Sequence, residues 1–246
     1  MSAEEGGGLR RFTGRGRNDL AYALQGAGPL LVCHPGGPGF AAGHLGSLGG
    51  LDATRSLVLF DPRGAGASAA ASSYRLADYV EDLEDLRGHL EIERLDLFGH
   101  SHGGYVVARY SAAYPDAVAR LVIDGTPLRP AAATPPASAA DYFTTYEGGE
   151  AYLARWGDQA DPTPSERFFA DEFVELDLSD DVGRIACPTL VIVGERDPWT
   201  GGSAAAEMAA LLPHGHAAVV AGAGHFAWLD APADYAAAVE RFLASS

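Results

Sequence analysis

The sequence has little cysteine and little positive charge. Cysteine occurs only at Cys33 and Cys187. The 246 residues include 17 Lys and Arg but 33 Asp and Glu, which gives a formal net charge of −16. A chain this acidic lacks the basic face that nucleic acid or an anionic membrane would need, so we expect neither as a partner. Both cysteines adjoin apolar runs, where buried inert thiols are more common than a disulfide or a metal pair.

Long hydrophobic runs are also missing. No run approaches the roughly 20 apolar residues that a membrane-spanning helix requires. The first 18 residues lack the apolar core of a signal peptide, and their glycines are typical of a frayed tail. No histidine or cysteine spacing indicates a zinc site, and we expect no metal and no cofactor. The sequence therefore favours a cytoplasmic protein.

Short apolar runs alternate with segments of helical spacing. The runs lie at 29–34, 56–61, 94–99, 120–125 and 189–194. Runs that are apolar throughout and end in Gly, Asp or His are typical of buried parallel strands. Residues 76–90 place apolar side chains on one stripe and acids on the other, which predicts an amphipathic helix. Residues 10–13 and 20–25 predict a leading hairpin. Strands separated by helices indicate an α/β fold with a mostly parallel sheet.

One stretch, residues 129–184, breaks this alternation. It begins rich in Pro and Ala and continues with helical patterns. Excursions this long in compact domains are usually functional, which favours a short helical cap over a pocket rather than an ordinary surface loop. We therefore divide the chain into a core, 1–128 and 185–246, and a cap, 129–184. The cap's aromatic residues predict either an apolar underside or internal packing: Tyr142, Phe143, Tyr146, Tyr152 and Trp156.

The stretch GHSHGG, residues 99–104, places one hydroxyl between histidines and glycines. A strand that turns sharply into a helix strains the residue at the turn and leaves no room for bulk around it. Ser101 would then stand at the carboxyl end of the strand, above a helix N-terminus that stabilises negative charge. The spacing is that of the G-x-S-x-G nucleophile elbow, and the alternative is a helix-capping serine in a glycine-rich turn.

A serine hydroxyl needs a base to become a nucleophile, and the base needs an acid that orients it. In chains with this elbow the acid and the histidine follow the serine in that order. Asp197 lies just after the predicted strand 189–194, and His225 lies in the Gly-rich loop GAGH. Both positions belong to the carboxyl edge of the sheet, where open parallel sheets bind ligands. We expect Asp197 and His225 to complete the site.

Other residues could fill these roles. Asp124 ends the predicted strand 120–125 and stays open as an alternative acid, because an acid there can also reach the histidine. His100 and His102 adjoin the serine, but residues beside an elbow point into the sheet or towards the oxyanion. His214 and His216 flank the turn PHGH and are expected in solvent.

The stretch VCHPGGPGF supplies a third element. A predicted strand ends at His34, and the chain then opens into Gly36–Gly39. Two backbone N–H groups must face the oxyanion of a tetrahedral intermediate. One should come from His102, which follows the nucleophile, and the other from this loop. Pro38 has no N–H, so we expect the second donor to be Gly37.

The order and spacing of four motifs resemble the α/β-hydrolase fold superfamily over nearly the whole chain. They are HPGGPG, DPRGAGAS at 61–68, GHSHGG, and the pair GERD and GAGH. Within the superfamily, they most resemble the proline iminopeptidase branch and the small esterases near it. The resemblance implies an eight-stranded, mostly parallel sheet with helices on both faces. It also implies Ser101 as nucleophile, His225 as base, Asp197 as acid, and Gly37 with His102 as oxyanion donors.

The resemblance narrows the chemistry. Dehalogenases and epoxide hydrolases of this fold need Asp at the elbow, but position 101 is Ser. We therefore expect a serine hydrolase that cleaves a small ester, thioester, lactone or amide through an acyl-enzyme. The alternatives are a lyase or C–C bond hydrolase with the same triad, and a catalytically silent binding protein. A small acyl compound is the expected partner, and the sequence is compatible with a homodimer.

A proline iminopeptidase-like aminopeptidase is a further alternative. Such enzymes use cap carboxylates to hold the free amine of the substrate, and this cap is short by comparison. Candidate carboxylates exist, although such residues are more often solvated surface charges: Glu147, Glu150, Glu166 and Glu172.

Overall fold

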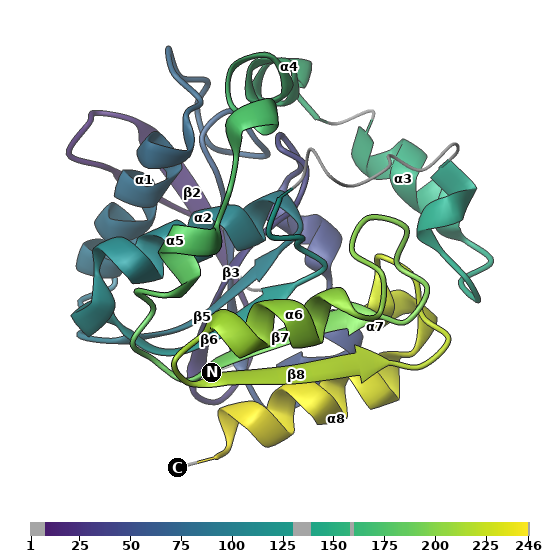
Figure 1. Ribbon diagram of the computed structural model, residues 1–246. Coiled ribbons are helices and arrows are strands. Elements are labelled where there is room, and N and C mark those ends of the chain that lie inside the picture. The colour runs from purple at the N-terminus through teal and green to yellow at the C-terminus, as the bar shows by residue number, and fades with distance from the viewer. Residues whose placement is uncertain (1–7, 130–138, 158–159, 246) are drawn as a thin grey trace, which may run out of the picture.

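An eight-stranded sheet forms the centre of the computed structural model, which describes residues 8–129, 139–157 and 160–245 (Figure 1). Its strands are β1 (Arg10–Thr13), β2 (Asp19–Gly26), β3 (Leu30–His34), β4 (Ser56–Asp61), β5 (Leu95–His100), β6 (Val118–Asp124), β7 (Thr189–Gly194) and β8 (Gly215–Val220). The spatial order is β1-β2-β4-β3-β5-β6-β7-β8. β1 and β2 form an antiparallel hairpin, and β2 pairs antiparallel with β4; the strands from β4 to β8 along this order pair in parallel.

The predicted α/β fold with a mostly parallel, eight-stranded sheet is confirmed, as is the leading hairpin. One local prediction was wrong. His216 lies within β8, paired with Leu190 of β7, rather than beside a turn. Its side chain is nevertheless exposed, as that of His214 is, because β8 is the edge strand of the sheet. The glycine-rich start (1–7) and most of the Pro/Ala-rich stretch (130–138) lie outside the described residues.

Helices cover both faces of the sheet. One face carries α1 (Leu76–His89), α2 (His102–Ala113), α5 (Ser179–Val182) and α6 (Ala204–Leu211). The other carries α8 (Pro232–Leu243), the short α7 (Ala227–Asp230) and the 3-10 turns η1 (Ala42–Leu45) and η2 (Leu48–Ala53). A further 3-10 turn, η3 (Pro115–Ala117), precedes β6. In Figure 1, α6 and α8 lie on opposite sides of β8.

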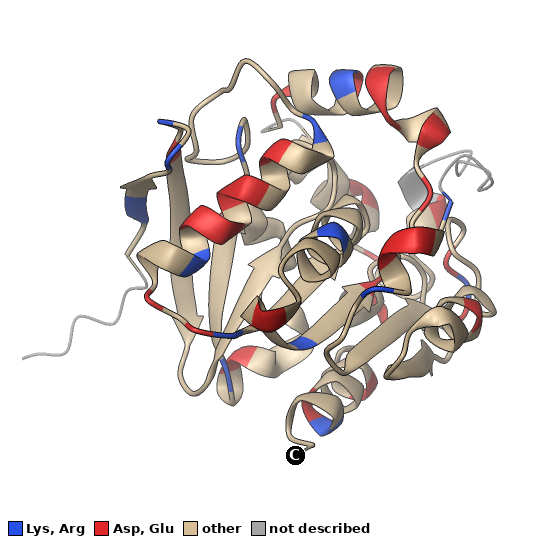
Figure 2. Ribbon diagram, turned by 60° about the vertical axis from the view of Figure 1, so that its left-hand side comes forward, with Lys and Arg blue, Asp and Glu red and all other residues tan. Residues whose placement is uncertain are grey.

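The sequence explains why both faces are buried. Alternate residues of β3 contribute to different apolar clusters: Val32 to the one under α1 and α2, Leu31 and Cys33 to the one under α8. This alternation follows from the two-residue period of a strand. Both cysteines are buried and free, as expected. α1 buries its apolar stripe, and acidic residues recur along the same helix in Figure 2.

The predicted cap is helical where the structure describes it. It contains η5 (Ala139–Tyr142), α3 (Gly149–Gly157), α4 (Pro162–Asp171) and η6 (Phe173–Glu175), and α3 and α4 lie above the sheet in Figure 1. The last residues that we assign to the cap also pack against the core. Leu178 and Val182, beside and within α5, are fully buried in the core cluster under α2. The division at residue 184 therefore stays a prediction.

The motif DPRGAGAS at 61–68 has a structural explanation. The Asp61 carboxylate accepts backbone N–H groups of Ala42 and Ala67, both at 2.8 Å, and so ties the loop after β3 to the loop after β4. Arg63 makes two hydrogen bonds of 2.6 and 2.7 Å to the Asp82 carboxylate of α1. Both side chains of this pair are nearly inaccessible to solvent, and removing one partner of a buried pair usually costs about 3–5 kcal/mol. The motif therefore fixes the loops beneath the site.

None of the helices in the described ranges combines the length and the apolar composition that crossing a bilayer would require.

Candidate active site

Ser101 occupies a strained turn between β5 and α2. Its backbone has φ of 51° and ψ of −116°, a conformation that a residue with a Cβ adopts rarely. The strand next to β5 holds it there. The Ser101 N–H donates to the carbonyl of Asp124 at 2.8 Å, and the Ser101 carbonyl accepts from the hydroxyl of Thr126 at 2.9 Å. The strain is therefore balanced by contacts with the end of β6.

The glycines around Ser101 permit the close passage of strand and helix. A Cβ at Gly99 would lie 2.5 Å from the carbonyl oxygen of Gly103, which is nearer than real Cβ atoms come. A Cβ at Gly103 would lie 2.5 Å from the carbonyl oxygen of Pro35 in the loop after β3. The elbow predicted from GHSHGG is thus required by the packing of three backbone segments.

Asp197 and His225 form a buried pair beside this turn. Asp197 follows β7, and its Oδ2 lies 2.9 Å from Nδ1 of His225. Its Oδ1 accepts the N–H groups of Trp199 at 2.8 Å and Thr200 at 3.3 Å. Burial alone would raise the pKa of Asp197, but the attraction of His225 and these hydrogen bonds more than offset it and hold the pKa below its ordinary value. Asp197 is therefore a carboxylate that can fix the tautomer of His225.

The alternative acid points elsewhere. Asp124 is buried at the end of β6, and its Oδ2 accepts the hydroxyl of Tyr235 of α8 at 2.9 Å. Burial raises the pKa of Asp124 well above its ordinary value, and the nearby Asp197 adds to this, although the Tyr235 bond opposes it. No bond joins Asp124 to His225 among the described residues. The geometry supports Asp197.

Contacts that the sequence analysis missed hold the backbone of the His225 loop. The His225 N–H donates to the carbonyl of Tyr142 at 2.9 Å. The Asp230 carboxylate accepts the N–H of Gly224 at 2.8 Å and those of Thr144, Thr145 and Tyr146 at 2.9–3.1 Å. One carboxylate therefore joins the loop to the start of the cap. No spacing in the sequence links residue 230 to residues some 85 positions earlier, because the link exists only through packing.

Ser101 and His225 line one cavity of about 370 Å³. The described residues include no hydrogen bond between the Ser101 hydroxyl and the His225 ring; in ligand-free sites such bonds are often long. Apolar and aromatic side chains make up much of the wall, among them Phe40, Tyr142, Leu153, Phe169 and Trp199. Tyr142 and Leu153 come from the predicted cap. No Asp, Glu, Lys or Arg of the described chain lines this cavity.

A second, much smaller space adjoins Ser101 on its other side. It measures about 40 Å³ and is lined by Gly37, His102, Phe168 and Phe173, among others. The N–H groups of Gly37 and His102 donate to no acceptor in the described part of the chain. The adjacent Gly36 N–H donates to Nε2 of His44 at 3.3 Å. Two unpaired N–H groups beside the serine are what an oxyanion site requires.

The other histidines near the serine are buried and neutral. Burial lowers the pKa of His44 to about 3, and it lowers that of His34 to about 4 against a small opposing effect of the Pro35 carbonyl. Burial also lowers the pKa of His100 and His102 well below the ordinary value. The His100 ring packs against His225, with centroids 4.6 Å apart, and its Nε2 lies 3.1 Å from the His225 carbonyl. His44, His100 and His102 line the spaces beside Ser101 and His34 lies behind them, so we expect none of these rings to act in place of His225.

The carboxylates suggested for amine binding lie away from the serine. Glu172 accepts the backbone N–H of Leu76 at 2.7 Å and so holds the start of α1. Glu147, Glu150 and Glu166 are exposed, and none of the four lines the cavity with Ser101. Across the described ranges no three His, Cys, Asp or Glu side chains are grouped so that they could hold a metal ion.

Comparison with known proteins identifies relatives of the chain. It is 31% identical over 122 residues to a cis-3-alkyl-4-alkyloxetan-2-one decarboxylase of Shewanella oneidensis, covering 48% of this chain and 38% of that protein. It is 38% identical over 113 residues to a proline iminopeptidase of Arabidopsis thaliana, covering 44% of this chain and 28% of that protein. The matches thus span well under half of these relatives. The enol-lactonase from Burkholderia xenovorans has the same fold, with a TM-score of 0.80, 21% identity, and 96% of this chain and 100% of that chain covered.

Family models agree with the fold and with the predicted resemblance. The model for TAP-like proteins matches residues 174–246. The model for the alpha/beta hydrolase fold matches residues 29–161, more than half of the chain, which include both the loop after β3 and the elbow. The chain belongs to the α/β-hydrolase fold family.

Proposed function

We propose that this protein is a serine hydrolase that cleaves a small, uncharged ester or lactone through an acyl-enzyme. The observation that carries the proposal is the buried pair of Asp197 and His225 beside Ser101 at a strained elbow. A hydroxyl, an imidazole and a carboxylate in one site are the components of nucleophilic acyl transfer.

Each group has one task in this proposal. Ser101 Oγ attacks the carbonyl carbon while His225 Nε2 takes its proton, and Asp197 holds the resulting imidazolium. The N–H groups of Gly37 and His102 bind the oxyanion, which stabilises the tetrahedral intermediate. His225 then returns the proton to the leaving oxygen, and an attacking water gives up its proton to His225 as the acyl-enzyme is hydrolysed.

The walls of the site favour an uncharged substrate. No charged side chain of the described residues lines the 370 Å³ cavity, and a buried amine or carboxylate there would lack a partner. An aminopeptidase would need an acid at this place, and Glu147, Glu150, Glu166 and Glu172 all lie elsewhere. An ester or lactone therefore fits better than a substrate with a free amine.

The unequal spaces on the two sides of Ser101 suggest where each part of the substrate binds. The space beside His102, about 40 Å³, has roughly a tenth of the volume of the 370 Å³ cavity on the other side. We assign the acyl group to this space, beside the oxyanion donors. The leaving alcohol then occupies the 370 Å³ cavity beneath Tyr142 and Leu153. This arrangement favours short acyl chains.

Acyl length tests the substrate class. We expect kcat/KM for p-nitrophenyl acetate to exceed that for p-nitrophenyl octanoate at least tenfold, because the longer chain does not fit the space beside His102. Proline naphthylamide should not be cleaved measurably. Faster turnover of the octanoate would show that the acyl group occupies the larger cavity, and rapid cleavage of the proline amide would favour an aminopeptidase.

Covalent labelling tests the nucleophile. A fluorophosphonate probe should label the wild-type protein at Ser101, and Ser101→Ala should abolish labelling without changing the circular dichroism spectrum. Ser165→Ala provides a matched control, because Ser165 lines the same cavity but has no histidine–carboxylate pair assigned to it. Full labelling of the Ser101→Ala variant in intact-mass analysis would disprove the assignment.

Substitution of Asp197 and of Asp124, which follow neighbouring strands, tests which carboxylate orients His225. Asp197→Asn should lower kcat by about 10³–10⁴-fold, since an amide favours the wrong imidazole tautomer. Asp124→Asn keeps an oxygen that accepts from Tyr235 and should change kcat less than about tenfold. Steady-state kinetics on p-nitrophenyl acetate measures kcat for both variants. A larger loss in Asp124→Asn than in Asp197→Asn would assign the orienting acid to the end of β6.

The pH profile tests the base. His225 must be neutral to accept the serine proton, so kcat/KM should rise with pH and then level off. Only one ionisation should be visible on this rise, and His225→Ala should lose it together with most of the activity. Burial lowers the pKa values of the neighbouring His34 and His44 to about 4 and 3, so neither ring accounts for an ionisation above about pH 5. A profile that is flat from about pH 5 to 9 would exclude a histidine base.

A further inference from the structure

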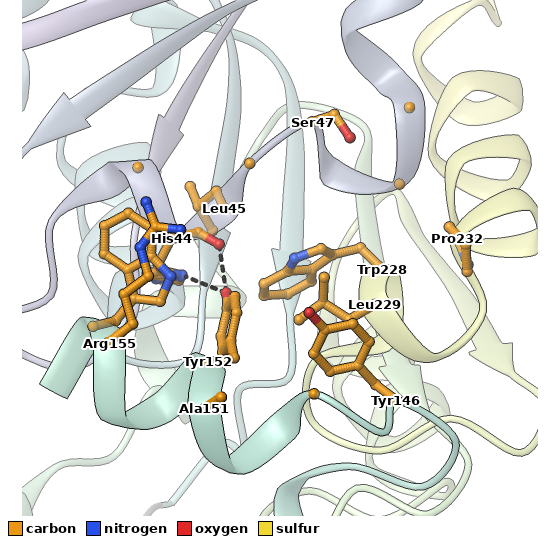
Figure 3. Close-up of a pocket in the computed structure, with 16 residues that line it drawn as sticks. His44, Leu45, Ser47, Tyr146, Ala151, Tyr152, Arg155, Trp228, Leu229 and Pro232 are labelled. Carbon is orange, nitrogen blue, oxygen red and sulfur yellow. Dashed lines mark hydrogen bonds between the residues drawn. The ribbon is translucent and has the colours of Figure 1, made fainter.

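A second cavity, larger than the one with Ser101, lies between the cap and the core. It measures about 840 Å³ and opens between η1 and η2, helix α3 and the residues around the start of α8 (Figure 3). Among the described residues, His44 alone lines both this cavity and the one with Ser101. The His44 ring is fully buried, so it forms part of the wall between the two spaces.

Aromatic rings from the cap and from α7 line this cavity. Tyr146, Tyr152 and Trp156 come from the cap, and Trp228 comes from α7. Tyr152 is fixed in place, because its hydroxyl donates to the carbonyl of His44 (Figure 3). Tyr146 packs against the rings of Phe143 and Tyr152, with centroids 5.8 and 6.2 Å away, and is still 37% exposed. The sequence predicted that the cap's aromatic residues form either an apolar underside or internal packing. Internal packing therefore accounts for only some of these residues.

Glycines leave room on the core side of the cavity. Gly46 and Gly50 both line it, and a Cβ at either position would meet no atom within 4 Å. Their backbone is thus exposed to the cavity rather than covered by a neighbouring side chain. A flat ring could approach the backbone there without a clash.

Arg155 of α3 is the only Lys or Arg among the described residues that line the cavity, and no Asp or Glu lines it. The guanidinium carbon lies 4.9 Å from the centre of the Trp156 ring, so one face of the guanidinium is held by a cation–π contact. In the part of the chain that the structure describes, its N–H groups donate to no acceptor and no carboxylate pairs with it.

We propose that this cavity binds a small aromatic carboxylate. A guanidinium stacked on a ring keeps its edge free, and that edge matches the two oxygens of a carboxylate. The aromatic body of the ligand would lie among Tyr146, Tyr152 and Trp228, where ring–ring contacts favour it. The site is distinct from the proposed catalytic cavity, whose walls carry no charge, and it stands whether or not Ser101 is the nucleophile.

Calorimetric titration with 2-naphthoate tests the site. We expect saturable binding of one molecule per chain to the wild-type protein. The uncharged isostere 2-naphthamide should bind at least tenfold more weakly, because it cannot pair with Arg155 as an anion. Ser101→Ala should bind 2-naphthoate as the wild type does, which separates this site from the proposed catalytic function.

Variants of two arginines and of one alanine locate the ligand. Arg155→Gln should weaken 2-naphthoate binding at least tenfold. Arg167→Gln, at an exposed arginine of α4 that does not line the cavity, should leave it unchanged. Ala151→Trp should block the cavity, since Ala151 lines it from α3. Absence of saturable binding, equal affinity for acid and amide, or unchanged affinity in Arg155→Gln would each overturn the proposal.

Discussion

The backbone of Ser101 is the constraint on which the site depends. A non-glycine residue with φ of 51° persists only where its surroundings hold it, and here the end of β6 does so through Asp124 and Thr126. The same turn brings Gly103 against the loop after β3. Three loops at one edge of the sheet are thereby fixed relative to one another, and with them the N–H groups of Gly37 and His102.

Four aspartates of this fold differ in their hydrogen-bond partners and in the effect of these partners on the carboxylate. Asp61, Asp197 and Asp230 all accept backbone N–H groups at the ends of strands or loops. For Asp230, burial raises the pKa, but the N–H groups of the cap and of Gly224 outweigh it and keep the pKa low. Asp124 has a tyrosine hydroxyl as its partner instead, and burial dominates its pKa. The neighbours of each carboxylate, rather than its position after a strand or at the end of a helix, decide its hydrogen bonds and its pKa.

Short motifs that follow predicted strands were enough to predict the fold and most of the candidate site. The elbow, the loop after β3 and Asp197 each follow an apolar strand, and parallel strands bring their carboxyl ends to one edge. His225 stands out through its Gly-rich loop, GAGH. The fold and the grouping of these residues could therefore be predicted. The packing of α5 could not, because this helix has too few residues for a periodic signal and contacts the core through Leu178 and Val182.

Contacts between distant segments explain what was missed. The bond from Gly36 to His44 depends on a 3-10 turn that follows the glycine-rich loop. Trp156, the ring that Arg155 contacts, packs against His44 of the same turn, with centroids 6.5 Å apart. Single residues of common types make these contacts, and their sequence neighbours resemble those of any surface helix. Only the packed structure distinguishes Arg155 from Arg167 on the next helix.

Because Asp230 bonds to residues 144–146, the two parts of the cap differ in how far their sequence can change without moving the His225 loop. The first part, up to Tyr146, shares hydrogen bonds with the loop that carries His225, so a change of backbone there is transmitted to the base. Helices α3 and α4 contribute walls but accept no hydrogen bond from that loop among the described residues. In an evolving or redesigned relative, 149–171 can thus be exchanged to alter what binds, while 142–146 must be inherited together with the end of β8 and α7.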